Sequence, residues 1–190
     1  MKLHRLVLVV ILSASLGVIS TPTGAHEASA KAELQNAAGQ PVGVIKLNQK
    51  KDGTVMVRVK VHDLPPGFHG FHVHETGICT PPSFTSAGFH FHPGETGGGG
   101  TPHPSEAGDM PVLLVNADGT GEARFKTDRF TIADLFDAHG SAIIVHANPD
   151  NYANIPTRYA PTGPDATTLN TGDAGGRIAC GVIEGDESFD

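Results

Sequence analysis

The stretch TVMVRVKVH, residues 54–62, has a valine at every second position. Val55, Val57, Val59 and Val61 fall on one face of an extended chain, and mostly polar side chains fall on the other. Because successive residues of a strand point to opposite sides, this pattern predicts a half-buried β-strand. Shorter strand signals lie at residues 43–47, 112–116, 121–126, 142–146 and 177–183.

Helical periodicity is nearly absent around these strands, and only residues 131–137 have room for a turn or two of helix. Many short strands separated by Gly and Pro predict an all-β sandwich or barrel. Turn-forming residues fill positions 116–119, NADG, so we expect a hairpin over residues 112–125. Two long stretches, 75–111 and 147–176, fit no strand, and loops of that length are usually functional.

The beginning of the chain resembles an export signal. Lys2 and Arg5 precede an apolar run at residues 6–19, which is shorter than the ~20 residues that cross a bilayer as a helix. Small residues follow, so cleavage is expected after Ala25 or after Ala30, and residues 31–190 form the mature domain. This predicts a secreted, periplasmic or cell-envelope protein without stable membrane insertion.

Charge and cysteine content narrow the function further. The formal net charge is −7, which makes nucleic acid an unsuitable partner. The chain has two cysteines, Cys79 and Cys180, and an exported chain meets oxidising conditions. One disulfide is therefore expected, the alternative being two buried free thiols.

Histidines gather in and beside the two long stretches. His72 and His74 are two apart in an extended segment, so both side chains can reach one metal ion. His90 and His92 repeat this spacing, and His146 follows an apolar run where a strand opens into a loop. An isolated His-x-His pair is a weak signal, but here several histidines occur together.

Two motifs carry a resemblance to a known family. They are GFHVHE at residues 70–75 and GDAGGRIACGV at residues 172–182, with SAGFHF at 86–91 and VH at 145–146 between them in the expected order. In these motifs the sequence resembles the copper/zinc superoxide dismutases over about residues 31–184. The resemblance implies an antiparallel Greek-key β-sandwich or barrel of immunoglobulin-like architecture, with two long functional loops.

The resemblance also implies a copper site and a reaction. The implied copper ligands are His72, His74, His90 and His146, and nitrogen donors suit Cu(II). His90 is the ligand shared with zinc and, together with Arg177, is expected to act in catalysis. The implied reaction is the dismutation of superoxide to oxygen and hydrogen peroxide as copper cycles between Cu(II) and Cu(I).

Three further positions acquire roles from the resemblance. Arg177 matches an arginine beside the copper channel, where a local positive charge attracts anionic superoxide to a negatively charged protein. Asp150 matches an aspartate that links a copper ligand to a zinc ligand by hydrogen bonds. Cys79 and Cys180 match the disulfide of the family.

The zinc site departs from the family pattern. Asp109 fits the aspartate ligand, but the two additional histidine positions fall on Gly98 and Glu106 in an ungapped alignment. His103 is close in sequence, so the predicted zinc ligands are His90, His103 and Asp109, completed by His92 or Glu106. The alternative is a copper-only centre with a degraded zinc site. Retention of Asp150 favours zinc.

Two functions of different class remain for the chain. A superoxide dismutase requires the full copper set, and a non-catalytic copper-binding or copper-delivery protein on the same fold does not. No implied copper ligand is missing, which favours the enzyme. The sequence leaves the oligomeric state open, with a homodimer among the options.

Overall fold

The computed structural model describes residues 28–95, 97 and 101–186. The alternating stretch forms strand β3, Val55–Val61, with its four valines buried. The other strands are β1 (Ser29–Asn36), β2 (Pro41–Gln49), β4 (Gly67–His69), β5 (Phe71–His74), β6 (Leu113–Val115), β7 (Gly121–Thr127), β8 (Ala142–His146) and β9 (Arg177–Gly185).

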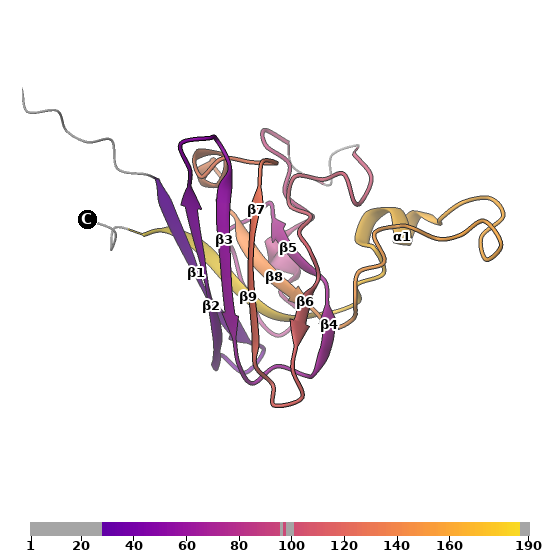
Figure 1. The fold of residues 1–190 in the computed structure, drawn as a ribbon, viewed down its shortest axis with the longest axis horizontal. Helices are drawn as coiled ribbons and strands as arrows, with labels where there is room; N and C mark the ends of the chain where they lie inside the picture. Colours follow the sequence, from indigo (N-terminus) through magenta and orange to yellow (C-terminus); the bar gives the residue numbers. More distant parts are fainter. Residues whose placement is uncertain (1–27, 96, 98–100, 187–190) are drawn as a thin grey trace, which may run out of the picture.

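Seven of these strands form one curled antiparallel sheet in the order β5-β8-β9-β1-β2-β3-β7, and β4 pairs with β6 in a second, two-stranded sheet (Figure 1). The small sheet connects the two edges of the large one along the chain. β4 leads through Gly70 into edge strand β5, and β6 leads through a turn into edge strand β7. The predicted all-β architecture is confirmed.

The concave side of the curled sheet encloses one main hydrophobic core. Alternate residues of β1, β2 and β3 point into it, among them Leu34, Ile45, Leu47 and Val57, which are fully buried. Burying one such side chain stabilises the fold by about 1.5–3 kcal/mol. All five residues of β8 are buried, so its terminal histidine is held within packed surroundings.

The predicted turn at residues 116–119 is present. Asn116 N–H donates to the carbonyl oxygen of Thr120 at 2.7 Å, and Gly119 adopts φ +83°. Beyond the turn the expected hairpin does not continue, because β6 pairs with β4 and β7 pairs with β3. The turn therefore marks the passage from the small sheet to the large one.

Strands β1 and β4 and helix α1 lie outside the strand and helix predictions. β1 begins at Ser29, at the boundary of the predicted leader, and its buried face starts with the small side chains Ala30 and Ala32. Helix α1, Ala166–Thr171, lies within the second long stretch, where the Asp165 side chain accepts a hydrogen bond from Thr168 N–H as an N-cap. The predicted helical segment at 131–137 contains a 3₁₀ turn, Ala133–Phe136.

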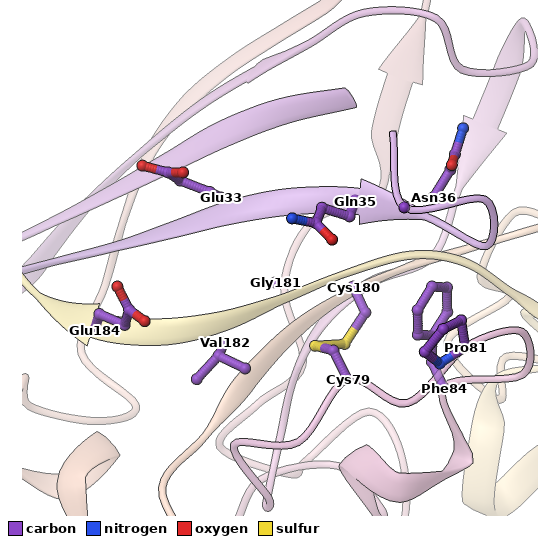
Figure 2. Close-up of a pocket in the computed structure, with 11 residues that line it drawn as sticks. Glu33, Gln35, Asn36, Cys79, Pro81, Phe84, Cys180, Gly181, Val182 and Glu184 are labelled. Atoms are coloured by element: carbon purple, nitrogen blue, oxygen red, sulfur yellow. A yellow bond between two sulfur atoms is a disulfide. The ribbon is translucent and has the colours of Figure 1, made fainter. Parts of the chain in front are cut away.

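The long stretches connect the strands as predicted, and they run in different directions. The described part of residues 75–111 crosses the end of the sheet near β5, whereas the segment carrying α1 extends away from it (Figure 1). The first stretch is tied to β9 by the Cys79–Cys180 disulfide, whose Cα atoms are 5.7 Å apart. Figure 2 shows this disulfide beside a surface cavity of about 280 Å³, near Glu33 and Glu184.

Among the described residues, no helix has the length and apolar character needed to span a membrane. The predicted leader falls mainly on residues 1–27, outside the described part of the chain.

Candidate metal centre

The first two predicted copper ligands lie on one strand. His72 and His74 are two apart in β5, and both are buried. β5 pairs antiparallel with β8, with Phe71 opposite Val145, so His146 at the end of β8 lies next to the start of β5. Strand pairing alone therefore brings together three of the predicted ligands.

His90 completes this group from the first long stretch. It forms an isolated antiparallel bridge with His74, and its ring centroid lies 4.1 Å from that of His72. One ligand atom each from His72, His74, His90 and His146 lies within 4.8 Å of the others. We call these four residues the histidine cluster.

The hydrogen bonds of the cluster orient its nitrogens. Nδ1 of His74 and Nδ1 of His146 each lie against a backbone carbonyl oxygen, at 3.0 and 3.1 Å, and Nε2 of His72 lies 2.7 Å from Oδ2 of Asp150. These nitrogens carry the hydrogens, because carbonyl and carboxylate oxygens only accept. The opposite nitrogens, Nδ1 of His72 and Nε2 of His74 and His146, are buried without any hydrogen-bond partner. Three free lone pairs are thus fixed at the cluster.

Burial keeps these imidazoles neutral. It lowers the pKa of His72 to about 4 and that of His146 to about 3, and it holds the pKa of His74 well below its usual range. A metal ion needs the unprotonated form of imidazole. The cluster can therefore bind a metal at neutral pH without first losing protons.

A second group of donors adjoins the cluster on the far side of His90. Oδ1 of Asp109 lies 2.8 Å from Nδ1 of His90 and 2.9 Å from Nδ1 of His103. Oε2 of Glu106 lies 2.9 Å and 3.5 Å from the same two nitrogens. All four side chains are buried. We call these residues the mixed cluster. Since its carboxylates face Nδ1 of His90, Nε2 of that ring is left for the histidine cluster.

The mixed cluster is electrostatically unlike its neighbour. Burial acts to lower the pKa of His103, yet the adjacent carboxylates of Asp109, Asp150 and Glu106 raise it to about 11. Burial acts in the opposite sense on Asp109, where His103 and His90 hold the pKa at about 2. In the mixed cluster these pairings outweigh desolvation, so its side chains favour their charged forms.

Asp150 lies between the two clusters and is hydrogen-bonded to both. Its Oδ2 accepts from Nε2 of His72 at 2.7 Å, and its Oδ1 accepts from Nε2 of His103 at 2.8 Å. Gly172, at φ +54°, makes room for this contact, because a Cβ there would collide with Asp150 and His103. One buried carboxylate therefore fixes the ring orientation of a candidate ligand in each cluster.

A close backbone contact places the mixed cluster against β5. Val73 N–H donates to Gly108 at 2.9 Å, Gly108 N–H donates to Phe91 at 2.9 Å, and Phe91 N–H donates to Val73 at 2.9 Å. A Cβ at position 108 would collide with the carbonyl oxygen of Val73. The glycine is required here because the loop must approach the strand closely enough for Asp109 to reach His90.

Arg177 is half-buried at the start of β9 and held by the first long stretch. Its Nη1 donates to the carbonyl oxygen of Phe84 and its Nη2 to that of Gly88, both at 2.6 Å. Gly88 also accepts from Nδ1 of His74, so one carbonyl oxygen connects the guanidinium to the histidine cluster. After burial and His90, the charge of Arg177 is a further cause of the lowered pKa of His74.

Some residues at the site escape prediction from sequence. Tyr152 stacks on His103 with ring centroids 6.3 Å apart, and its hydroxyl accepts from Val112 N–H at 2.8 Å. Arg129, just beyond β7, donates to carbonyl oxygens of the loop that carries His103. Neither has a distinctive spacing from the histidines. Among the described residues, the second set of donor atoms within 4.8 Å of one another comes from His72, His90, His103 and Asp109, and it includes neither of the predicted alternative ligands, His92 and Glu106.

The donor sets fit the metals implied by the resemblance. The orphaned imidazole nitrogens of the histidine cluster are the donors that Cu(II) favours, and the nitrogen and oxygen donors of the mixed cluster suit zinc. The fold and these donors together define an all-β metal-binding protein with two adjoining sites.

Comparison with known proteins identifies the family. The model of the copper/zinc superoxide dismutase (SODC) family matches residues 42–183. A Cu-Zn superoxide dismutase of Mycobacterium tuberculosis is 41% identical over 181 residues, covering 87% of this chain and 68% of that protein. One of Caulobacter vibrioides is 34% identical over 164 residues, covering 82% and 86%. The chain belongs to the copper/zinc superoxide dismutase family, and the predicted resemblance is confirmed.

Solved structures agree on the fold. A SOD-like protein from Bacillus subtilis matches with a TM-score of 0.62 at 30% identity, covering 80% of this chain and 96% of that one. The clock protein EA4 matches with a TM-score of 0.65 at 28% identity, covering 86% and 98%. This fold thus occurs in a SOD-like protein and in a clock protein, so the activity of this chain has to be argued from its site.

Proposed function

We propose that this protein is a superoxide dismutase, which converts two superoxide ions and two protons to dioxygen and hydrogen peroxide. The observation that carries the proposal is the histidine cluster, where three buried nitrogens without hydrogen-bond partners converge from two paired strands. Copper bound there supplies the one-electron oxidation and reduction that dismutation requires. His72, His74, His90 and His146 are its ligands in this proposal.

His90 has a second task. Its Nδ1 faces the carboxylates of the mixed cluster, so Nε2 is the nitrogen free to hold a proton. In the proposed reaction His90 holds a proton at Nε2 after the first superoxide has reacted and gives it up to the second. The mixed cluster, through His90, His103 and Asp109, holds zinc and keeps the ring in place between the two sites.

Arg177 attracts the substrate. Superoxide is an anion and the chain has a net charge of −7, so capture depends on a local positive potential. The hydrogen bonds of Arg177 to the carbonyl oxygens of Phe84 and Gly88 fix its guanidinium near His74. This placement supports a role in bringing superoxide to the metal.

The proposed site of action is outside the cytoplasm. The Cys79–Cys180 disulfide is consistent with an oxidising compartment. Removal of an export leader after Ala25 leaves β1 whole, whereas cleavage after Ala30 removes two residues of the strand. We therefore favour the earlier cleavage position. Assembly as a homodimer stays a prediction.

The competing function is copper binding or delivery without catalysis. One experiment separates it from dismutation: the exported chain is loaded with copper and zinc, metals are counted per chain, and superoxide consumption is followed by pulse radiolysis. We expect one copper per chain together with rapid dismutation. In His74→Gln, both copper retention and activity fall by more than the ~100-fold that loss of an outer partner costs. Full copper loading of the unmodified chain without dismutation supports the delivery function instead.

A further inference from the structure

The mixed cluster contains one buried acceptor that the residues around it do not satisfy. Oε2 of Glu106 is buried and makes no properly aligned hydrogen bond, although it lies 2.9 Å from Nδ1 of His90. Nδ1 of His103, 3.5 Å away from Oε2, is likewise buried without a hydrogen-bond partner. Donor atoms that crowd together without bonding one another are arranged as ligands around a shared cation.

Glu106 and Asp109 are presented together by one tight turn. Glu106 N–H donates to Oδ2 of Asp109 at 3.0 Å, and Asp109 N–H donates to the carbonyl oxygen of Glu106 at 3.2 Å. Oδ2 is therefore occupied within the turn, and Oδ1 is the atom directed to His90 and His103. The turn places two carboxylates on the same face, each with one oxygen available to a metal.

The rival ligand is placed differently. His92 forms a backbone bridge with Glu95 in the turn that follows, whereas Oε2 of Glu106 lies 2.9 Å from Nδ1 of His90 and 3.5 Å from Nδ1 of His103. Its Nε2 is buried without a hydrogen-bond partner, and no described Asp or Glu side chain pairs with it as Glu106 does with His90. Geometry therefore distinguishes two residues that spacing in the sequence leaves equivalent.

We propose that Glu106 is the fourth ligand of the second metal site and the residue that makes this site discriminate against copper. This inference rests on the proposed function, in which the histidine cluster takes copper and the mixed cluster takes zinc. Two imidazoles and two carboxylates form the second donor set, and the carboxylates balance the charge of a divalent cation. Copper(II) binds most sites more tightly than zinc does, so selectivity has to come from ligand type and geometry. The two sites differ in ligand type, because the histidine cluster offers only nitrogen donors and the mixed cluster also offers two carboxylate oxygens.

The first test removes the ligand without changing its size. The full exported chain is loaded with one equivalent of copper, and zinc binding is then measured by competition with a chelator. We expect Glu106→Gln to lower zinc affinity by at least ~100-fold, above the range for outer partners, and His92→Gln to leave it unchanged. Loss of zinc from His92→Gln with retention in Glu106→Gln overturns the proposal, as does unchanged zinc affinity in both variants.

The second test changes the ligand type. Glu106→His supplies a third imidazole, and each protein is offered copper and zinc together after the first equivalent of copper is bound. We expect the variant to take at least ~10-fold more copper into the second site than the unmodified chain, measured by metal analysis and by the magnetic coupling of adjacent Cu(II) ions in electron paramagnetic resonance. Equal partition of copper in the two proteins overturns the selectivity role.

The two proposals fail in different ways. An unmodified chain that binds no copper at the histidine cluster contradicts the proposed function, whatever the zinc results are. A chain that binds copper and dismutes superoxide, but whose zinc binding ignores Glu106, contradicts only the present inference.

Discussion

The two metal-binding groups of this protein are neighbours that share His90, yet they are built in different ways. The histidine cluster takes three of its members from paired strands β5 and β8, and burial keeps its imidazoles neutral. The mixed cluster takes its remaining members from a loop, and its side chains hold charged partners. Strand pairing therefore fixes the positions of the ligands of the redox site, which serves as a rigid frame. The contacts of a loop tune the metal affinity of the second site.

Asp150 provides the strongest test of whether the two metal-binding groups are independent, because it is hydrogen-bonded to a member of each. In Asp150→Asn the side-chain amide keeps one acceptor and gains a donor, so it cannot accept from His72 and His103 together. We expect a fall of about 10–100-fold in affinity for at least one of the two metals. Copper and zinc competition titrations on the same variant identify which cluster depends on the carboxylate.

Asp165→Asn is the matched control for that substitution. Asp165 lies in the same long stretch, where it caps α1, and asparagine is an equally good N-cap. Both metal affinities are expected to stay unchanged in this control. If Asp150→Asn also leaves both affinities unchanged, the hydrogen bonds of Asp150 are not what couples the two clusters.

Arg177 tests whether the strand-built site depends on charge beyond its ligands. Arg177→Ala should retain copper but lower kcat/KM by about tenfold, equivalent to ~1.4 kcal/mol of transition-state stabilisation. The deficit should shrink as ionic strength rises, because salt screens the attraction that the variant has lost. Stopped-flow or pulse-radiolysis rates at several salt concentrations measure this.

Arg158 provides the control for a charge in a different place. It lies in the segment that extends away from the sheet, with its guanidinium 4.7 Å from the ring centroid of Tyr159 (Figure 1). Arg158→Ala should leave kcat/KM and its salt dependence unchanged. Equal losses in the two variants would argue for a general charge effect in place of local steering.

The strands show how far sequence pattern reaches. β3 can be predicted from the sequence because large apolar side chains alternate with mostly polar ones, as Val55, Val57, Val59 and Val61 do. β1 uses the same alternation, but Ala30 and Ala32 carry too little apolar surface to stand out, and the strand begins where a leader is expected to end. Helix α1 is short and depends on a single capping contact, which a search for helical periodicity does not detect.

The candidate metal centre could also be predicted only in part from the sequence. Every predicted copper ligand converges, because strand spacing and the family motifs both specify their positions. The choice between His92 and Glu106 could not be made from sequence, since both lie in one irregular loop whose course depends on long-range contacts. Two contacts determine that course: Gly108 packs against Val73, and Asp150 is hydrogen-bonded to both His72 and His103. Neither contact can be recognised from the neighbouring residues in the sequence.

Arg129 tests the claim that loop contacts tune the second site, and its expected effect is the smallest. Its Nη1 donates to the carbonyl oxygens of Pro104 at 2.8 Å and Glu106 at 2.9 Å, which ties the zinc loop to the end of β7. Because the side chain is exposed, Arg129→Gln should speed zinc release only about threefold, ~0.7 kcal/mol, as for one net hydrogen bond. Arg124→Gln, on β7 opposite Arg58, is the control and should change nothing. The rate of zinc release into excess chelator measures the effect of both substitutions, and copper affinity should be unaffected.

A parallel loss of copper affinity in Arg129→Gln would mean that the loop supports both clusters. The positions of the copper ligands would then depend on loop contacts as well as on strand pairing, contrary to the comparison drawn above.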